Sequence, residues 1–134
     1  VRGIKHMAFA VRDAAKALEA YARFLHVSAE TEIQVYPKSK NRVALFYLGG
    51  IEYQLCESMD PEGRFAKWID ERNVEGLHHI CYEVEDIIAA RDRLKESGAR
   101  VLGNGEPKIG AHGKPVIFLH PKDFNGALVE LEQV

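Results

Sequence analysis

Apolar and polar residues alternate along two stretches of the chain. In His79-Ile80-Cys81-Tyr82-Glu83-Val84 every second residue is bulky and apolar, which is the period of a strand with one buried face. The stretch His6-Met7-Ala8-Phe9-Ala10-Val11 alternates in the same way, 73 positions earlier (79 − 6). The same offset relates Asp13 to Asp86, each of which is placed to cap a following helix. The pattern predicts one module that occurs twice.

The first module is predicted to contain a strand, a helix and three further strands. These elements are a strand at 1–11, a helix starting at Asp13, and strands at 28–36, 43–48 and 51–56, with turns at 37–41 and Gly49-Gly50. The helix is expected to bury the positions that follow helical spacing, which are Ala14, Ala17, Leu18, Tyr21 and Leu25. On the first strand, Ala8 and Ala10 are small, and we expect the space beside them to be open.

A connector at 58–75 is expected to hold a short helix that begins near Asp60-Pro61-Glu62 and buries Phe65, Trp68 and Ile69. The second module then repeats the order of the first. Its elements are a strand at 79–84, a helix from Asp86 to a stop at Gly98, the start of a strand at Val101-Leu102, a glycine-rich loop at 103–113, and strands at 115–119 and 127–131. The helix is expected to bury Ile87, Ala90 and Leu94. Phe46 and Phe118 lie 72 positions apart, and Gln54 and Glu130 lie 76 apart, because the second hairpin is longer.

This order predicts an α+β fold of two tandem β-α-β-β-β modules that form a curved mixed sheet around a cleft. We expect a single domain over residues 1–134, with module 1 at about 1–57, the connector at about 58–75 and module 2 at about 76–134. A cleft between curved sheets suits a small ligand.

Composition narrows the classes of function. The chain has 134 residues and a formal net charge of −2, which gives no reason to expect nucleic acid or an anionic membrane as partner. No run approaches the length of a membrane span. Cys56 and Cys81 lie in apolar strand-like runs and are expected to be reduced core thiols. The chain begins at Val1 without Met, and we expect a cytoplasmic protein, or a mitochondrial matrix protein if a transit peptide was removed.

Four residues at repeat-equivalent positions carry the candidate chemistry. His6 and His79 lie on first strands, and Gln54 and Glu130 lie on last strands. Duplicated modules are commonly related by a twofold axis, so we expect these four side chains to converge. Imidazole nitrogen with carboxylate and amide oxygen suits a divalent cation such as Co, Zn, Mn, Ni or Fe(II). One carboxylate leaves the ion net positive and able to stabilise an anionic intermediate.

Each candidate ligand could instead be an ordinary core or surface residue, and the repeat pattern helps to decide between the two roles. A single strand histidine is more often a core or surface residue, but two at equivalent positions favour ligands. Glu130 lies in an otherwise apolar strand, where an unpaired buried carboxylate would be costly. His78 falls on the face opposite His79 and breaks the repeat. The remaining histidines, which are His26, His112 and His120, lie in loops or turns without repeat partners.

Several motifs resemble one family. The chain has His-His-Ile before a helix that starts at Val-x-Asp, the loop Pro-Lys-Ile-Gly-Ala-His-Gly at 107–113, Phe-Leu-His-Pro-Lys at 118–122 and a closing Leu-Val-Glu-Leu. It is similar in these motifs to the methylmalonyl-CoA epimerases of the vicinal-oxygen-chelate superfamily, which also contains glyoxalase I and extradiol dioxygenases. The resemblance covers nearly the whole chain and implies a glyoxalase-like fold.

The resemblance implies that His6, Gln54, His79 and Glu130 are the metal ligands. Glu130, a carboxylate in an apolar strand, is also the candidate for one catalytic proton-transfer group. Gln at the second ligand position favours an epimerase over microbial-type glyoxalase I. The implied reaction interconverts (R)- and (S)-methylmalonyl-CoA by proton abstraction through a metal-stabilised enolate. The implied partners are an acyl-CoA substrate and a second copy in a homodimer, and neither nucleic acid nor a membrane is expected.

Inversion at carbon requires two proton-transfer groups, or one that swings from one side of the carbon to the other. In some family members the second group is a glutamate on the third strand of module 1, and the equivalent position here is aligned with Ala44. Tyr47 or a water could replace it, although core packing is the alternative role for Tyr47. The loop at 110–113 could offer N–H groups to substrate. Lys114 and Lys122 could meet coenzyme A phosphates or could be solvated surface residues.

Three other functions remain open. The first is a glyoxalase I-type lactoylglutathione lyase, which shares the metal and the enolate. The second is an Fe(II) oxygenase that uses two histidines and one glutamate, with Gln54 not bound. The third is a metal-free binding protein on the same scaffold.

Overall fold

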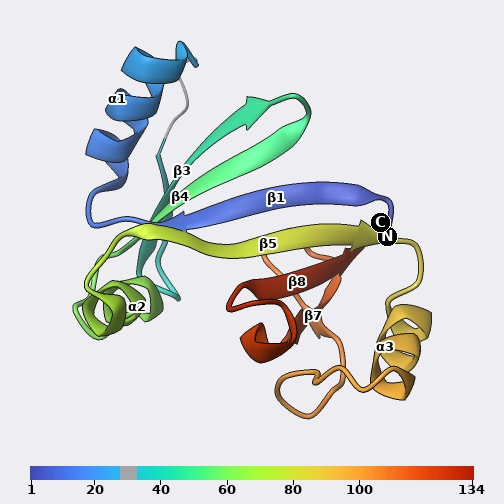
Figure 1. Cartoon of the computed structure of the whole chain (residues 1–134). Coiled ribbons are helices and arrows are strands. Elements are labelled where there is room, and N and C mark those ends of the chain that lie inside the picture. Colours follow the sequence, from blue (N-terminus) through green and yellow to red (C-terminus); the bar gives the residue numbers. More distant parts are fainter. Residues whose placement is uncertain (28–32) are drawn as a thin grey trace. The chain divides into compact units, whose positions relative to one another are not determined.

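The computed structural model describes residues 1–27 and 33–134 and divides the chain into two compact units (Figure 1). The N-terminal unit is His6–His78, and the C-terminal unit combines Val1–Lys5 with His79–Val134. Strand β1 (Gly3–Ala10) begins in the C-terminal unit and ends in the N-terminal unit, and β5 (Gly76–Val84) does the reverse. The single domain expected over 1–134, with its module boundaries, stays a prediction.

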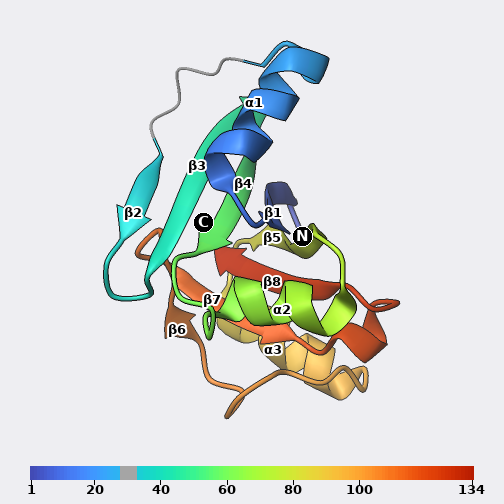
Figure 2. The same ribbon diagram turned by 90° about the vertical axis from the view of Figure 1, so that its left-hand side faces the viewer.

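The N-terminal unit pairs its strands in the order β2-β3-β4-β1. Besides its part of β1 it contains α1 (Ala14–Leu25), β2 (Gln34–Tyr36), β3 (Asn41–Leu48), β4 (Ile51–Ser58) and α2 (Arg64–Arg72). β1 pairs parallel to β4, whereas β2, β3 and β4 are antiparallel neighbours. Figure 2 shows α1 lying along β3 and β4. Gly49 and Gly50, with φ of 56° and 79°, make the tight turn between β3 and β4.

The C-terminal unit pairs its strands in the order β1-β5-β8-β7-β6, and the backbone N–H of Arg2 donates to the Glu83 carbonyl at 2.8 Å. Its further elements are α3 (Ile87–Glu96), β6 (Lys108–Ile109), β7 (Pro115–Leu119), the 3₁₀ turn η1 (Pro121–Asp123) and β8 (Leu128–Gln133). β5 is parallel to β8, and β6 and β7 add antiparallel pairs. The predicted α+β class and the mixed strand pairing are thus confirmed.

The two modules share one register. Ala8 on β1 is the partner of Gln54 on β4, and Cys81 on β5 is the partner of Glu130 on β8. In the antiparallel hairpins, Gln54 faces Leu45 on β3 and Glu130 faces Phe118 on β7. The equivalent of Phe118 is therefore Leu45, so the pairing of Phe118 with Phe46 expected from the sequence is wrong by one residue.

Aspartates begin both long helices, as predicted. The Asp13 carboxylate accepts from the Lys16 N–H at 3.1 Å, and the Asp86 carboxylate accepts from the Ile88 and Ala89 N–H groups at 3.0 Å. These bonds satisfy donors that the first turn of a helix leaves without partners. The expectation that Leu25 is buried is wrong, because it is 54% exposed at the end of α1.

Four element boundaries differ from the expectations. Only Gln34–Tyr36 of the strand expected at 28–36 is observed, and residues 28–32 lie outside the described part of the chain. α2 begins at Arg64 rather than near Asp60, although Phe65 and Ile69 are buried as predicted. Val101 forms a single bridge rather than the start of a strand. The short β6 within the glycine-rich loop was not anticipated.

The small residues on β1 have a packing role. Ala8 and Ala10 are fully buried in one cluster with Phe65 and Ile69 of α2. The space that the sequence left beside these alanines is therefore filled by α2, which packs its two apolar side chains against a surface without bulk. None of the helices in the described residues is long and apolar enough to cross a bilayer.

Candidate metal centre

The C-terminal unit brings two of the four candidate ligands together. His79 on β5 and Glu130 on β8 are both buried, and His79 Nε2 lies 3.3 Å from Glu130 Oε2. The ring of Phe118 packs edge-on against His79 with centroids 6.0 Å apart. Strand alternation places Glu130 on one face of β8 and its neighbours Val129 and Leu131 on the other.

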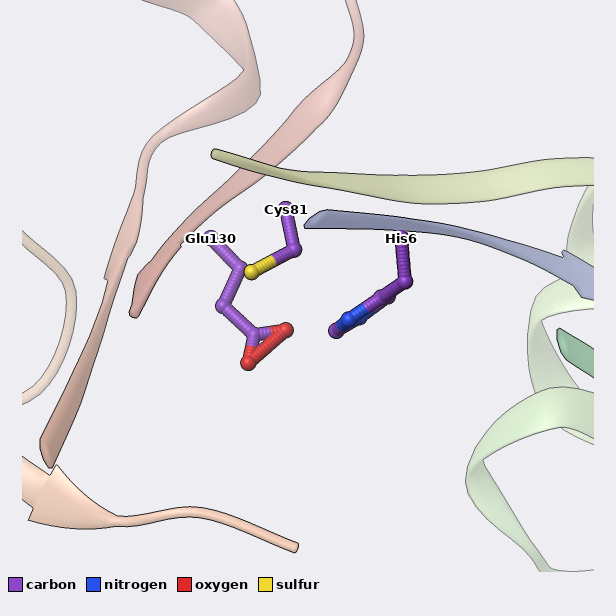
Figure 3. Close-up of side chains that lie close together, drawn as sticks. All are labelled: His6, Cys81 and Glu130. Atoms are coloured by element: carbon purple, nitrogen blue, oxygen red, sulfur yellow. The ribbon is translucent and has the colours of Figure 1, made fainter. Parts of the chain in front are cut away.

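Cys81 lies next to Glu130 in the paired strands, and Figure 3 shows the two side chains beside each other. Burial raises the pKa of the Cys81 thiol strongly, and the charges of Glu130 and Glu132 raise it further. The thiol therefore stays protonated at neutral pH and contacts the Tyr82 carbonyl, with 3.8 Å between sulfur and oxygen. Burial likewise raises the pKa of Cys56 to about 12. Both cysteines are free and buried, as predicted.

The N-terminal unit holds the other two candidate ligands in the equivalent register. His6 is buried on β1, and its backbone partner on β4 is Glu52, two residues before Gln54. The Gln54 amide Nε2 donates to Glu52 Oε2 at 2.8 Å. This bond uses the amide nitrogen of Gln54, so its carbonyl oxygen is the atom that can bind a cation.

Glu52 is a buried carboxylate that the sequence reasoning missed. It is 7% exposed and accepts hydrogen bonds from both Gln54 and the Tyr47 hydroxyl, the latter at 2.9 Å. The alternation of side chains along a strand could have identified Glu52, because it lies two positions from Gln54 and so shares its face.

Tyr47 does not have the packing role considered from the sequence, because it is 64% exposed. Its hydroxyl donates to Glu52, and this hydrogen bond, with the negative charge of Glu52 and a small effect of burial, raises the pKa of Tyr47. Tyr47 is therefore a donor that supports Glu52, and its hydroxyl loses a proton less readily than that of an unperturbed tyrosine.

Ala44 points to the wrong side of β3 for a proton-transfer group. It is fully buried in the cluster that includes Leu18 of α1. The residues that share a face with Gln54 are instead its partner Leu45 and, two positions on, Tyr47. The alignment of Ala44 with the family glutamate therefore does not correspond to the same side of the strand.

The adjacent histidines His78 and His79 have different surroundings. His78 packs against two aromatic rings of α2, with centroid distances of 4.9 Å to Phe65 and 5.6 Å to Trp68. His79 instead approaches Glu130. These contacts agree with the preference for His79 over His78 as the candidate ligand.

Of the three loop histidines, His112 has a contact that the sequence gave no reason to expect. His112 Nδ1 lies 3.0 Å from Glu132 Oε1, and Glu132 is 1% exposed. His26 is the left-handed cap of α1, and His120 caps η1 by accepting from the Lys122 N–H at 3.1 Å. A contact between a loop residue and a strand residue 20 positions later leaves no repeating pattern in the sequence, so the sequence could not predict it.

The donor set of the C-terminal unit fits a divalent cation. A buried imidazole nitrogen 3.3 Å from a buried carboxylate oxygen offers one neutral and one anionic ligand atom, the pair that zinc, cobalt and manganese accept. A cation there would also balance the charge of Glu130, which is costly to bury alone.

Comparison with known sequences places the chain in a family. A sequence model of the Glyoxalase/Bleomycin resistance protein/Dioxygenase superfamily matches residues 5–118. The chain therefore belongs to this superfamily, and the glyoxalase-like fold inferred from its motifs is confirmed.

Individual relatives narrow the class of protein further than the superfamily model does. The chain is 51% identical over 131 residues to the ethylmalonyl-CoA/methylmalonyl-CoA epimerase of Cereibacter sphaeroides, a match that covers 98% of this chain and 97% of that relative. It is 41% identical over 130 residues to the mitochondrial methylmalonyl-CoA epimerase of Homo sapiens, covering 97% and 73% of the two chains. A solved methylmalonyl-CoA epimerase in complex with methylmalonyl-CoA and NH4+ superposes with a TM-score of 0.82 at 30% identity, covering 99% of this chain and 94% of that one.

Proposed function

We propose that this chain is a methylmalonyl-CoA epimerase, an isomerase that interconverts the (R) and (S) forms of methylmalonyl-CoA with the help of a divalent metal ion. The observation that carries this function is the 51% identity to the Cereibacter sphaeroides epimerase over almost the full length of both chains. The buried pair of His79 and Glu130 supports it, because it supplies the ligand types that the chemistry requires.

We propose further that the two units make up one vicinal-oxygen-chelate domain over residues 1–134 and that the metal ligands are His6, Gln54, His79 and Glu130. The proposal is supported by the shared register of the modules, in which Gln54 and Glu130 occupy equivalent positions. Two neutral imidazoles, one amide oxygen and one carboxylate give the site a single negative charge. The native ion is proposed to be Co, Zn, Mn or Ni, all of which accept these ligands.

A divalent ion bound there stabilises the negative charge that develops on the thioester oxygen when the α-proton leaves. The chain's own groups move the proton. Glu130 is proposed to exchange it at a carboxylate oxygen on one side of the carbon. His79 would bind the same ion, and its Nε2 lies 3.3 Å from Glu130 Oε2, so the shared ion would fix the position of that carboxylate.

Inversion needs a second group on the opposite side of the carbon, and we propose Glu52 for this role. It is a buried carboxylate of the N-terminal unit, and its two oxygens are oriented by Tyr47 and Gln54. Tyr47 thus supports the base rather than acting as the base.

The acyl-CoA substrate is the proposed partner, and a homodimer is the proposed assembly. The proposed location is the cytoplasm, or the mitochondrial matrix if the chain is imported. None of these assignments requires nucleic acid or a membrane.

The experiment is solvent deuterium exchange. Purified protein loaded with Co²⁺ is incubated with (S)-methylmalonyl-CoA in D₂O, and mass spectrometry follows deuterium at the α-carbon together with the appearance of the (R) form. Both should appear at catalytic rates. A protein that instead isomerises the glutathione adduct of methylglyoxal, and leaves the methylmalonyl α-proton in place, would be a glyoxalase-type enzyme and would contradict the proposal.

The Glu96→Gln variant is the control, because Glu96 is an exposed carboxylate on α3. It should exchange deuterium at the wild-type rate, whereas Glu130→Gln should exchange at least tenfold more slowly.

A further inference from the structure

The tip of the β6–β7 hairpin, residues 110–114, is held in one place on the C-terminal unit. Within the tip, the Gly110 N–H donates to the Lys114 carbonyl at 2.9 Å, and the Gly113 N–H donates to the Gly110 carbonyl at 3.0 Å. Gly110 packs so closely against β7 that an added Cβ would lie 2.9 Å from Val116 Cγ1. Val116 is the cross-strand partner of Glu132 on β8. The hairpin tip therefore lies beside Glu132.

His112, at this tip, contacts a carboxylate that is almost completely buried. Its Nδ1 lies 3.0 Å from Glu132 Oε1, and Glu132 is 1% exposed. The other carboxylate oxygen, Oε2, has no hydrogen-bond partner among residues 1–27 and 33–134. An ionised carboxylate only accepts hydrogen bonds, so His112 Nδ1 is the donor in this pair. Because a buried charge is costly unless it is paired, Glu132 is suited to balance a positive charge on the His112 ring.

This pair lies on the face of β8 that carries the proposed metal ligand Glu130. Glu130 and Glu132 are two residues apart on one strand, so their side chains project to the same side, roughly 7 Å from each other. The side chains of His79 and Glu130 are only 7% and 9% exposed, whereas that of His112 is 33% exposed. Of these side chains, His112 is the most accessible to a ligand that binds beside Glu130.

We propose that His112 is a substrate-binding residue of the proposed epimerase and that it recognises the free carboxylate of the malonyl group. This inference rests on the proposed function, in which the α-carbon lies beside Glu130 and the thioester oxygen binds the metal ion. A contact from Glu130 to the α-carbon, two bonds to a carboxylate oxygen and one hydrogen bond together span about the separation of the two glutamates. The phosphates of coenzyme A lie at the far end of the pantetheine arm, beyond this reach.

The ring of His112 can bind both carboxylates at once. In its charged form both ring nitrogens carry a hydrogen, so Nδ1 donates to Glu132 while Nε2 donates to the substrate. Hydrogen bonds between charged groups are stronger than neutral ones. The contact therefore selects malonyl-type thioesters, because a simple acyl thioester offers no acceptor at this position.

The test compares two ligands on one protein. The first is the equilibrium mixture of (R)- and (S)-methylmalonyl-CoA, and the second is isobutyryl-CoA, in which a methyl group replaces the carboxylate. Isothermal titration calorimetry with Co²⁺-loaded protein gives both Kd values, and their ratio is the carboxylate preference. Partial unfolding of a variant would affect both ligands alike, so the preference reports on recognition alone. Circular dichroism and metal analysis check that each variant is folded and loaded.

The His112→Asn variant should lose most of the carboxylate preference. The Asn side-chain amide keeps a donor for Glu132 near the place of Nδ1 and removes Nε2 together with the charge. The preference should fall at least about tenfold, which is the value of one hydrogen bond to a charged group. This fall should come from weaker binding of methylmalonyl-CoA, while the Kd of isobutyryl-CoA stays at its wild-type value.

Two further variants test the placement of the ring. Gly110→Ala keeps His112 but pushes the hairpin tip away from Val116, so it should lower the preference in the same direction by a smaller factor. His120→Gln is the matched control, because it removes a loop histidine of the same unit whose role is to cap η1. The preference of this control should equal that of wild type.

Steady-state kinetics separate recognition from proton transfer. In His112→Asn the KM for methylmalonyl-CoA should rise about tenfold or more, with kcat within about threefold of wild type, because a carboxylate bound equally in the ground state and the transition state contributes to affinity rather than to the chemical step. Loss of a proton-transfer group would instead lower kcat.

The inference is overturned if His112→Asn keeps the wild-type preference, if His120→Gln lowers it as much as His112→Asn does, or if kcat falls while KM is unchanged. These failures leave the proposed function intact as long as the wild-type protein epimerises methylmalonyl-CoA. A wild-type protein that leaves the α-proton in place in D₂O would overturn the proposed function and, with it, the role of His112.

Discussion

The two modules share a backbone register and differ in what they place on it. At the equivalent strand positions, module 1 has His6 and Gln54, whereas module 2 has His79 and Glu130, and only Glu130 brings a carboxylate to the proposed ligand set. The comparison teaches that duplication of the module gives the proposed ligands equivalent strand positions, while Gln54 in one copy and Glu130 in the other set the charge of the proposed ligand set. An ion held by this set keeps a net positive charge.

The helix–sheet interfaces differ in the same way. Module 1 fills the interface with stacked aromatic rings, and module 2 fills it with a mainly aliphatic cluster that includes Leu119, Val129 and Leu131. The strand pairing tolerates both solutions, because the register depends on backbone hydrogen bonds and alternation rather than on the size of each side chain. The copies have thus diverged on both faces of the sheet.

Removal of the module 2 carboxylate should have the largest effect. Glu130→Ala deletes the proposed charged ligand and the proposed proton-transfer group together, so kcat/KM for methylmalonyl-CoA should fall about 10³-fold or more. The bound metal, measured by mass spectrometry of the purified protein, should be lost as well. Full turnover by this variant would end the mechanism proposed here.

The neighbouring histidines allow a sharper comparison within one strand. His79→Ala should weaken metal binding by at least the roughly 10²-fold that loss of an outer partner of a ligand causes. His78→Ala should leave metal binding unchanged and lower the free energy of unfolding by about 1 kcal/mol, because it loses the ring contacts with Phe65 and Trp68. Metal titration and urea denaturation of both variants measure the difference. Equal metal loss in the two variants would contradict the assignment of His79.

Giving module 1 the carboxylate of module 2 should change metal affinity and kcat by less than the removal of Glu130 does. Gln54→Glu adds a second carboxylate, which should raise metal affinity about tenfold and lower kcat by a similar factor, because a more neutralised ion stabilises developing negative charge less. Competition with a chelator and steady-state kinetics give the two numbers. If affinity and kcat both stay at wild-type values, Gln54 does not bind the ion.

The smallest predicted effect concerns stability at low pH in the C-terminal unit. The Arg100 side chain and backbone N–H hold the pKa of the Asp123 carboxyl at about 2, below its usual value near 4. A depressed pKa in the folded state contributes stability above pH ~4 that is lost as the pH falls toward 2.

The Asp123→Asn variant should therefore have a lower Tm than wild type at pH 6, and the difference should shrink toward zero near pH 2. Scanning calorimetry across this range measures it. Asp92→Asn is a matched control, since Asp92, whose side chain is 55% exposed, pairs with Arg91 on α3. A Tm difference for Asp123→Asn that stays constant from pH 6 to pH 2 would show that the ion pair is not the cause.

Much of this fold follows from local patterns in the sequence. Alternation located the long strands, and the aspartates Asp13 and Asp86 located the helix starts, because both signals act over a few residues. The one-residue error at Phe46 arose because a hairpin of unequal length hides the register until the partner strands are known.

The site was only partly predictable for a related reason. Glu130 and His79 could be selected from strand period and repeat offset, and their contact in the C-terminal unit agrees with that selection. The link between His112 and Glu132 depends on how a glycine-rich loop folds back, which no local rule specifies.

The most direct test of the central claim is the number of divalent ions bound per chain in wild type and in one variant from each module, His6→Ala and His79→Ala. Titration of metal-free protein with Co²⁺, followed by its visible absorption, counts the sites. We predict one ion per chain in wild type and loss of tight binding in both variants, because the modules supply equivalent ligands to one centre. Retention of tight, stoichiometric binding by His6→Ala would show that module 2 binds the ion alone and would contradict the account.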